Sequence, residues 1–310
     1  MADSNTRVRA YLGITGEDLP LDWMDVFGGP RPLEVEIGFG TGEYLCQIAR
    51  ERPQVGFIGF EQAPGRIVKT RARIEAAGLR NVRLLFWDAV WGLQYLFSSG
   101  SLDAVHCLFP CPWPKKRHAK NRLFQPRVLS LVNDRLRMGG TLTVVTDEKA
   151  YAAWLMEQVP GTGFLVEAET HGARYGTMFE AKWRAEGQED FYKVVLRKEQ
   201  ALSSLCQEVA RVRIYDIQKM DPAKMVLRDE KRKAAITFGE IIHDQTKAMA
   251  MVLAIVTEEG QTQHLWIKMV RGEKGWSVRA AEGSLALPTP GAHRALALVS
   301  EAAVLSGGRA

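Results

Sequence analysis

The chain has 310 residues, of which 46% are hydrophobic, so it is long for one domain and apolar enough to bury a core. Its formal net charge of +5 is compatible with an acidic partner, and its longest apolar run is far shorter than the roughly 20 residues of a membrane span. The start of the chain, residues 1–11, is polar and shows no apolar signal region. The cysteines Cys46, Cys107, Cys111 and Cys206 form neither a Cys-x-x-Cys pair nor a zinc-site spacing. The composition thus argues against a membrane protein and a metal site, and favours reduced thiols in the cytoplasm.

Residues 1–30 contain several Gly and Pro and are predicted to form an irregular N-terminal extension. Four of its apolar side chains are expected to dock on the core: Trp23, Met24, Val26 and Phe27. From residue 31 to 197, apolar runs alternate with helical patterns. The predicted strands are 33–37, 55–60, 82–87, 102–108, 141–146, 164–169 and 191–196, and the predicted helices are 42–52, 65–77, 89–97, 124–137 and 149–159. This alternation predicts an α/β domain with a parallel sheet and helices on both faces.

Residues 198–310 follow a different pattern, which predicts a small C-terminal α+β appendage. Strands are expected at 211–217, 233–242, 249–257, 264–270 and 276–279, hairpin turns at 258–260 and 271–275, and a closing helix at 290–305. Several cations near its start could contact RNA or form an ordinary solvated face: Lys224, Arg228, Lys231, Arg232 and Lys233.

A glycine-rich segment lies where the first strand gives way to the first helix. Glu36 is followed by Gly38, Gly40 and Gly42. Glycines at this place let the backbone turn sharply and approach a ligand closely. The third glycine comes one residue earlier than in the dinucleotide fingerprint. The form acid-x-Gly-x-Gly-x-Gly resembles the first motif of class I methyltransferases, which bind S-adenosylmethionine; the alternative is a tight turn that packs helix on strand.

Three further acids directly follow predicted strands: Glu61, Asp88 and Asp147. Ligands bind at the carboxyl ends of the strands in an open α/β sheet. An acid after the second strand can accept hydrogen bonds from two ribose hydroxyls, and one after the third can accept from an adenine amino group. Taken alone, Asp88 is better explained as a helix cap.

Two other segments point to a nucleic acid. Residues 109–118 hold three prolines within five residues, which predicts a stiff, extended loop that presents Trp113 beside Lys115, Arg117 and His118. Such a surface suits a flat anionic ligand such as an RNA nucleotide, although a solvated charge run is the simpler interpretation. Residues 174–183 are rich in polar and aromatic groups, which fits contact with a nucleic acid. The alternative interpretation of this segment is an amphipathic helix that packs Phe179 and Trp183 inward.

Together these motifs resemble the bacterial tRNA (guanine-N7-)-methyltransferase family over about residues 31–197. The matching stretches are Glu36-Ile37-Gly38-Phe39-Gly40 with Gly42, Gly59-Phe60-Glu61, Asp88-Ala89, residues 109–118 with Arg122-Leu123, Thr146-Asp147, and Thr177-x-Phe179-Glu180. The resemblance implies a Rossmann-like class I enzyme that methylates N7 of guanine 46, in the variable loop of tRNA, without a metal. It implies contacts to S-adenosylmethionine from Glu36, Gly38, Gly40, Gly42, Glu61, Asp88 and Cys111. It implies substrate contacts from Lys115, Arg117, His118, Asp147, Thr177 and Glu180.

One position departs from the family pattern, because Cys111 stands where the family has an active-site Asp between two prolines. Guanine N7 carries a lone pair and no proton, so its attack on a methyl group needs placement rather than a general base. A neutral thiol stabilises positive charge on the base poorly, whereas a thiolate beside Lys115 and Arg117 would do so better. Three interpretations remain open: a methyltransferase that acts on guanine N7 in tRNA, a catalytically weakened or inactive RNA-binding homologue, and a methyltransferase of another RNA or a small molecule. The basic loop and residues 177–180 argue against a small molecule.

Overall fold

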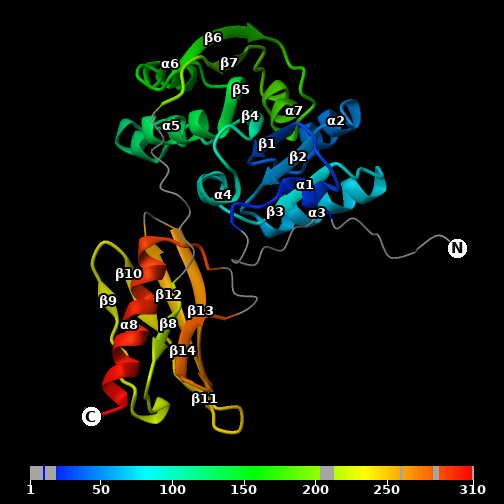
Figure 1. Cartoon of the computed structure of the whole chain (residues 1–310). Coiled ribbons are helices and arrows are strands. Elements are labelled where there is room, and N and C mark those ends of the chain that lie inside the picture. Colours follow the sequence, from blue (N-terminus) through cyan, green and yellow to red (C-terminus); the bar gives the residue numbers. More distant parts are fainter. Residues whose placement is uncertain (1–9, 11–18, 203–212, 259–260, 282–285, 309–310) are drawn as a thin grey trace, which may run out of the picture. The chain divides into compact units, whose positions relative to one another are not determined.

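The computed structural model describes residues 10, 19–202, 213–258, 261–281 and 286–308 (Figure 1). The chain divides into two compact units, one of residues 1–13 and 20–207 and one of residues 14–19 and 208–310. Four sequence predictions fall wholly or partly outside the described residues: the irregular extension at 1–30, Cys206, the start of strand 211–217 and the turn at 258–260. In the described part, no helix combines the length and hydrophobicity of a membrane span.

The first unit is built on a seven-stranded sheet with the order β3-β2-β1-β4-β5-β7-β6. Its strands are β1 (Leu33–Ile37), β2 (Gly56–Phe60), β3 (Val82–Leu85), β4 (Leu102–Leu108), β5 (Leu136–Thr146), β6 (Phe164–His171) and β7 (Phe191–Lys198). Strands β1 to β5 pair in parallel, whereas β7 runs antiparallel between β5 and β6. The chain order reverses between β1 and β4, and in open α/β sheets a ligand crevice lies at the carboxyl ends beside such a switch point.

Helices cover both faces of this sheet, as the sequence predicts. They are α2 (Glu43–Glu51), α3 (Pro64–Ala76), α4 (Ala89–Leu96), α5 (Pro126–Arg135), α6 (Lys149–Glu157) and α7 (Met178–Ala185). Phe57 of β2 packs in one cluster with buried residues of α2 and α3. Phe60 points to the opposite face, because three residues separate it from Phe57, and it packs on Gly92 of α4. The α/β prediction is therefore confirmed.

Three local predictions in this unit are wrong. Residues 23–27 form the helix α1 (Trp23–Phe27), capped by the side chain of Asp22, and Met24 is exposed rather than docked. The predicted helix 124–137 ends at Arg135, since Leu136 already pairs with Leu102 as part of β5. The chain after the proline-rich loop is not extended throughout, because residues 116–121 form the 3₁₀ helix η1 (Lys116–Asn121).

The second unit has a seven-stranded antiparallel sheet of order β8-β14-β13-β12-β10-β9, with β11 pairing to β12. Its elements are β8 (Tyr215–Ile217), η2 (Pro222–Lys224), β9 (Glu230–Lys231), β10 (Ala235–Phe238), β11 (Ile242–Asp244), β12 (Met249–Glu258), β13 (Gln261–Gly272), β14 (Gly275–Ala280) and α8 (Pro290–Ser306). Alternate residues of β12 and β13 are buried in a cluster with α8, so one face of the sheet makes the core. The single strand predicted at 233–242 is wrong: β10 and β11 pair with different parts of β12.

Candidate active site

The glycine loop turns the chain from β1 into α2 with three left-handed residues. Gly38, Gly40 and Gly42 have φ of 71°, 58° and 78°, which a residue with a Cβ adopts only at a cost. A Cβ on Gly38 or Gly40 would meet nothing within 4 Å, but one on Gly42 would lie 2.4 Å from the Thr70 side chain of α3. Gly42 thus permits helix packing, while Gly38 and Gly40 leave open space beside the backbone.

Glu61 joins the ends of β1 and β2. Its Oε2 accepts a hydrogen bond from the Gly40 amide at 3.0 Å, and its Oε1 accepts from the amides of Gln62 and Ala63 at 2.9 and 3.0 Å. Arg66 lies 3.4 Å from Oε2. The structure therefore shows a residue that shapes the glycine loop, and a ribose contact by Glu61 remains a prediction.

Asp88 caps a helix, which confirms the structural role that the sequence suggests for this residue taken alone. Its Oδ1 accepts from the amides of Val90 and Trp91 at 2.9 and 3.2 Å, in the first turn of α4. Its Oδ2 accepts from the side chain of Gln62 at 2.8 Å, which couples it to the loop that follows β2. A contact from Asp88 to adenine is not tested by these bonds.

Glu36 is the buried acid of the site that lacks a complete set of partners. Its side chain is 3% exposed, and Oε2 has no hydrogen-bond partner in the described part of the chain. Burial, with the negative charges of Glu43 and Glu61 adding to it, raises the pKa of Glu36 to about 8. A buried acid without a partner is costly, so this position is prepared for a cation or a hydrogen-bond donor.

Glu36 faces a pocket that residues from distant segments complete. The glycine loop contributes Gly38 and Gly40, and the segment before α7 contributes Thr177. Five other lining residues lie within the sequence motifs but were not predicted as contacts: Phe39, Thr41, Phe109, Met178 and Phe179. The motifs had not included Glu43, Tyr44 and Leu108. Tyr44 could have been found from its place two residues after the glycine motif, in the first turn of α2. Among the described residues, no cluster of potential metal ligands is present.

Thr177 and Glu180 organise the start of α7. The Thr177 hydroxyl accepts from the Glu180 amide at 3.1 Å, and the buried Glu180 carboxylate accepts from the amides of Arg174 and Tyr175 at 2.9 and 2.7 Å. Phe179 packs on Phe109 with ring centroids 6.0 Å apart, so the inward packing foreseen for this side chain is confirmed. Both Glu180 oxygens are engaged with the backbone, and a substrate contact by Glu180 remains a prediction.

The proline-rich loop is held by Arg122 rather than by its own cations. Arg122 donates to the carbonyl of Pro112 at 2.9 Å and stacks over the Trp154 ring at 4.8 Å. Phe109 and Trp113 have φ of 55° and 43°, so this support stabilises a strained backbone. In contrast, Lys115, Arg117 and Cys111 are exposed, and the rings of His118 and Trp113 meet edge to face at 5.8 Å.

Asp147 follows β5 and is half-buried. Burial raises the pKa of Asp147, although its backbone and Lys182 counteract this. Its carbonyl accepts from the Gln188 side chain at 3.2 Å, which connects the end of β5 to the segment after α7. Asp147 does not line the pocket of Glu36, nor do Cys111, Lys115, Arg117 and His118.

Known proteins of similar sequence identify the family. A family model described as a putative methyltransferase matches residues 30–193. A tRNA (guanine-N(7)-)-methyltransferase of Aquifex aeolicus is 30% identical over 87% of this chain and 93% of its own length. The chain belongs to the tRNA (guanine-N(7)-)-methyltransferase family. Its relative in Chlorobium phaeobacteroides is 42% identical over 54% of this chain and 81% of its own length.

Another relative shows that the match to this methyltransferase family includes the second unit. The tRNA (guanine-N(7)-)-methyltransferase of Thermotoga maritima is 29% identical over 93% of this chain and 94% of its own length. A match of that extent reaches well beyond residue 197, where the resemblance by motifs ends. The second unit is therefore shared with some members of the family.

The residues of the site fit the methyl donor that this family uses. S-adenosylmethionine carries an ammonium and a sulfonium, and the pocket offers the Glu36 carboxyl, which is without a partner among the residues described, with the acids Glu43 and Glu61 close enough to shift its pKa. The open space beside Gly38 and Gly40 leaves room for a ligand against the backbone. A cationic ligand would remove the electrostatic cost of ionising Glu36.

Proposed function

We propose that this protein transfers a methyl group from S-adenosylmethionine to N7 of a guanine in tRNA, at position 46 in the variable loop. The observation that carries the proposal is the buried Glu36 carboxyl, which has no hydrogen-bond partner among the described residues and lies in a glycine-lined pocket of a chain from the tRNA (guanine-N(7)-)-methyltransferase family. When bound, S-adenosylmethionine supplies an electrophilic methyl group on a cationic sulfur.

On the donor side, Gly38 and Gly40 leave the backbone open, and the buried Glu36 carboxyl becomes negatively charged when a cationic ligand displaces its proton. Glu61 contributes by holding the Gly40 amide, so that the loop is ordered before the ligand arrives. Such preorganisation lowers the entropic cost of binding.

On the acceptor side, the protein must place a base rather than remove a proton, since N7 has a free lone pair. Phe109 and Phe179 bring aromatic rings to the pocket that Glu36 lines, and aromatic rings stack on RNA bases that are splayed out of the helix. Thr177 lies at the same pocket, and Asp147 at the end of β5 is proposed to hold the guanine edge.

The exposed basic loop supplies charge for the tRNA backbone. Lys115 and Arg117 are exposed, and the rigid prolines and Arg122 keep them in a defined place. Contacts of this kind increase affinity for any phosphate backbone and fix its register, without reading the base itself.

The decisive experiment is methyl transfer to an unmodified tRNA transcript, followed by nucleoside analysis. The expected product is 7-methylguanosine, and a transcript with adenine in place of guanine 46 should yield none. Methylation elsewhere would replace the assigned target. If the protein binds tRNA and S-adenosylmethionine but transfers nothing, the substitution of Cys111 for the family Asp has removed turnover and the protein is an RNA-binding homologue.

A further inference from the structure

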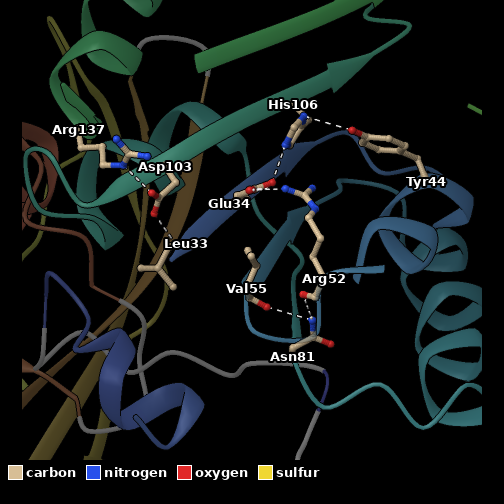
Figure 2. Close-up of polar contacts among 9 residues, drawn as sticks. All are labelled: Leu33, Glu34, Tyr44, Arg52, Val55, Asn81, Asp103, His106 and Arg137. Carbon is tan, nitrogen blue, oxygen red and sulfur yellow. Dashed lines mark hydrogen bonds and ion pairs between the residues drawn. The ribbon is translucent and has the colours of Figure 1, made fainter. Parts of the chain in front are cut away.

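A buried chain of polar contacts runs beside the pocket and is not used by the proposed reaction. The Tyr44 hydroxyl lies 3.4 Å from His106 Nδ1, and His106 Nε2 lies 2.9 Å from Glu34 Oε2. The other Glu34 oxygen, Oε1, accepts from Arg52 at 2.6 Å. Figure 2 shows these four side chains joined by dashed lines in the order Tyr44, His106, Glu34 and Arg52.

The sheet register explains why these residues meet. Glu36 pairs with His106 across β1 and β4, so their side chains share one face of the sheet, and Glu34 lies on that face two residues earlier. Helix α2 covers this face and brings Tyr44 at its first turn and Arg52 at its C-terminal cap. The side chains of His106 and Glu34 are 9% and 7% exposed, which makes their pairing obligatory.

The charge on Glu34 sets the direction of the hydrogen bonds. Burial raises the pKa of Glu34, but His106 and Arg52 together outweigh it and leave that pKa below its ordinary value. An ionised carboxylate only accepts, so the proton on the His106 ring belongs on Nε2. When the His106 ring carries a single proton, its bare Nδ1 accepts from the Tyr44 hydroxyl, and the lone pairs of the Tyr44 oxygen stay available to the pocket.

The ring of Tyr44 is also fixed in place. It meets His106 edge to face at 5.7 Å and Tyr175 at 5.6 Å, and the Tyr175 amide is held by Glu180. Tyr44 lines the same pocket as Glu36. Burial raises the pKa of the Tyr44 phenol, and the charge of Glu36 raises it further. Two acceptors therefore line the pocket: the Tyr44 oxygen, and the Glu36 carboxyl, which is ionised once a cation displaces its proton. This pair suits a cation with several N–H donors.

We propose that the Tyr44 oxygen is a second acceptor, beside Glu36, for the ammonium group of the methyl donor, and that His106 and Glu34 are positioning residues that keep its proton turned away. This inference rests on the proposed function, since it assigns part of the same donor site. An ammonium has three N–H groups, so Glu36 and Tyr44 can both be used at once.

Glu34→Gln tests the direction of the relay without removing a side chain. Arg52 requires an oxygen, so the new amide presents its oxygen to Arg52 and its NH₂ to His106 Nε2. The ring proton then moves to Nδ1 and is donated to Tyr44, whose hydroxyl hydrogen is forced toward the pocket. A donor now faces the ammonium, and binding weakens although Tyr44 itself is unchanged.

The experiment is isothermal titration of the full chain with two ligands, S-adenosylhomocysteine and 5′-methylthioadenosine, which lacks the ammonium and the carboxylate. Tyr44→Phe and Glu34→Gln should each weaken S-adenosylhomocysteine binding about tenfold or more, because each affects a hydrogen bond to a charged group. Neither should change 5′-methylthioadenosine binding. In Tyr44→Phe, adding Glu34→Gln should cost nothing further, since the hydroxyl through which Glu34 acts is gone.

Other outcomes separate the failures. Equal losses for both ligands, or additive losses in the double variant, would show that the relay only supports the fold and would overturn the inference. Tighter binding in Glu34→Gln would show the opposite proton direction and overturn it as well. If the unaltered protein bound neither ligand, the proposed function itself would fail. Tyr151→Phe is the matched control, because the buried Tyr151 hydroxyl has no partner among the described residues and does not line the pocket.

Discussion

The two ends of β1 carry the same residue type in opposite states. At the amino end, Glu34 is bonded to His106 and Arg52, and the Leu33 amide donates to Asp103, which also accepts from Arg137 (Figure 2). At the carboxyl end, two residues later on the same face, Glu36 is also buried, but one of its oxygens finds no partner in the part of the chain that the structure describes. The carboxylate at the amino end is bonded within the protein, whereas the carboxyl at the other end is open to a bond with a ligand.

This difference gives the two carboxyls opposite links to pH. The pKa of Glu34 is lowered, so its contribution to stability is present above the unfolded pKa and is lost as the pH falls through the folded pKa. The pKa of Glu36 is raised to about 8, so the native state holds a proton that the unfolded chain releases at lower pH, and stability falls as the pH rises toward 8. Substituting a side chain that is bonded within the protein should therefore change the free energy of unfolding, and substituting one that faces the pocket should change the affinity for a ligand.

The largest effect is expected where a completed interaction is broken. Glu34→Ala removes the acceptor of His106 and Arg52 and should lower the free energy of unfolding by about 2–4 kcal/mol at pH 7. Arg52 is partly exposed and can turn to water, which keeps the loss at that level rather than higher. Urea unfolding measures it. A loss below about 0.5 kcal/mol, the size of an ordinary surface substitution, would contradict the role given to this end of the strand.

The opposite end should respond in the opposite direction. Glu36→Gln removes the proton linkage, so its stability relative to the unaltered protein should rise steadily between pH 5 and pH 8, since the folded pKa of about 8 lies well above the ordinary value of 4.5. Unfolding at both pH values gives the difference, and a difference that does not change with pH would refute the raised pKa.

A cation bound beside Glu36 should also displace its proton. Titration with S-adenosylhomocysteine at pH 7 should release a proton, seen as a binding enthalpy that depends on the buffer.

A third test applies the same comparison, between a side chain bonded within the protein and an exposed one, to the basic loop. Arg122→Ala should lower the melting temperature by several degrees, because Arg122 bonds the Pro112 carbonyl and stacks on Trp154. Lys115→Glu should leave the melting temperature nearly unchanged, since the side chain is exposed, and should instead weaken tRNA binding and flatten its salt dependence. Filter binding at several salt concentrations checks the second variant. Similar losses of stability in both would remove the distinction.

The sequence predicts the open end of the site better than the engaged end. The glycine loop and the acids after the strands are local patterns, and they lie where the motifs indicate. The Glu34, His106 and Arg52 cluster could not be predicted, because it depends on the register of β1 with β4 and on where α2 ends. Glu180 illustrates an intermediate case. The pattern Thr177-x-x-Glu180 is also that of a helix capping box, so a structural role could have been read from it, although its carboxylate reaches residues 174 and 175.

The smallest expected change in stability, and the most informative change in rate, concerns Cys111. Its side chain is exposed, so Cys111→Asp should alter the free energy of unfolding by less than about 0.5 kcal/mol. A carboxylate is ionised at every working pH, whereas an ordinary thiol is mostly neutral at pH 7. A fixed anion near a base that becomes cationic stabilises the transition state more than the ground state, so the gain should appear in kcat rather than in KM.

The pH profile separates a true charge effect from a change of shape. Any dependence of the rate on pH that comes from the Cys111 side chain should vanish in Cys111→Asp. Cys111→Ser is the matched control, since it keeps the size but does not ionise, and it should be slow at every pH. A slower Cys111→Asp enzyme would mean that the surrounding loop has adapted to the thiol. In that case the role of the family Asp does not carry over to this position, and the open side of the site works by a different arrangement of charge.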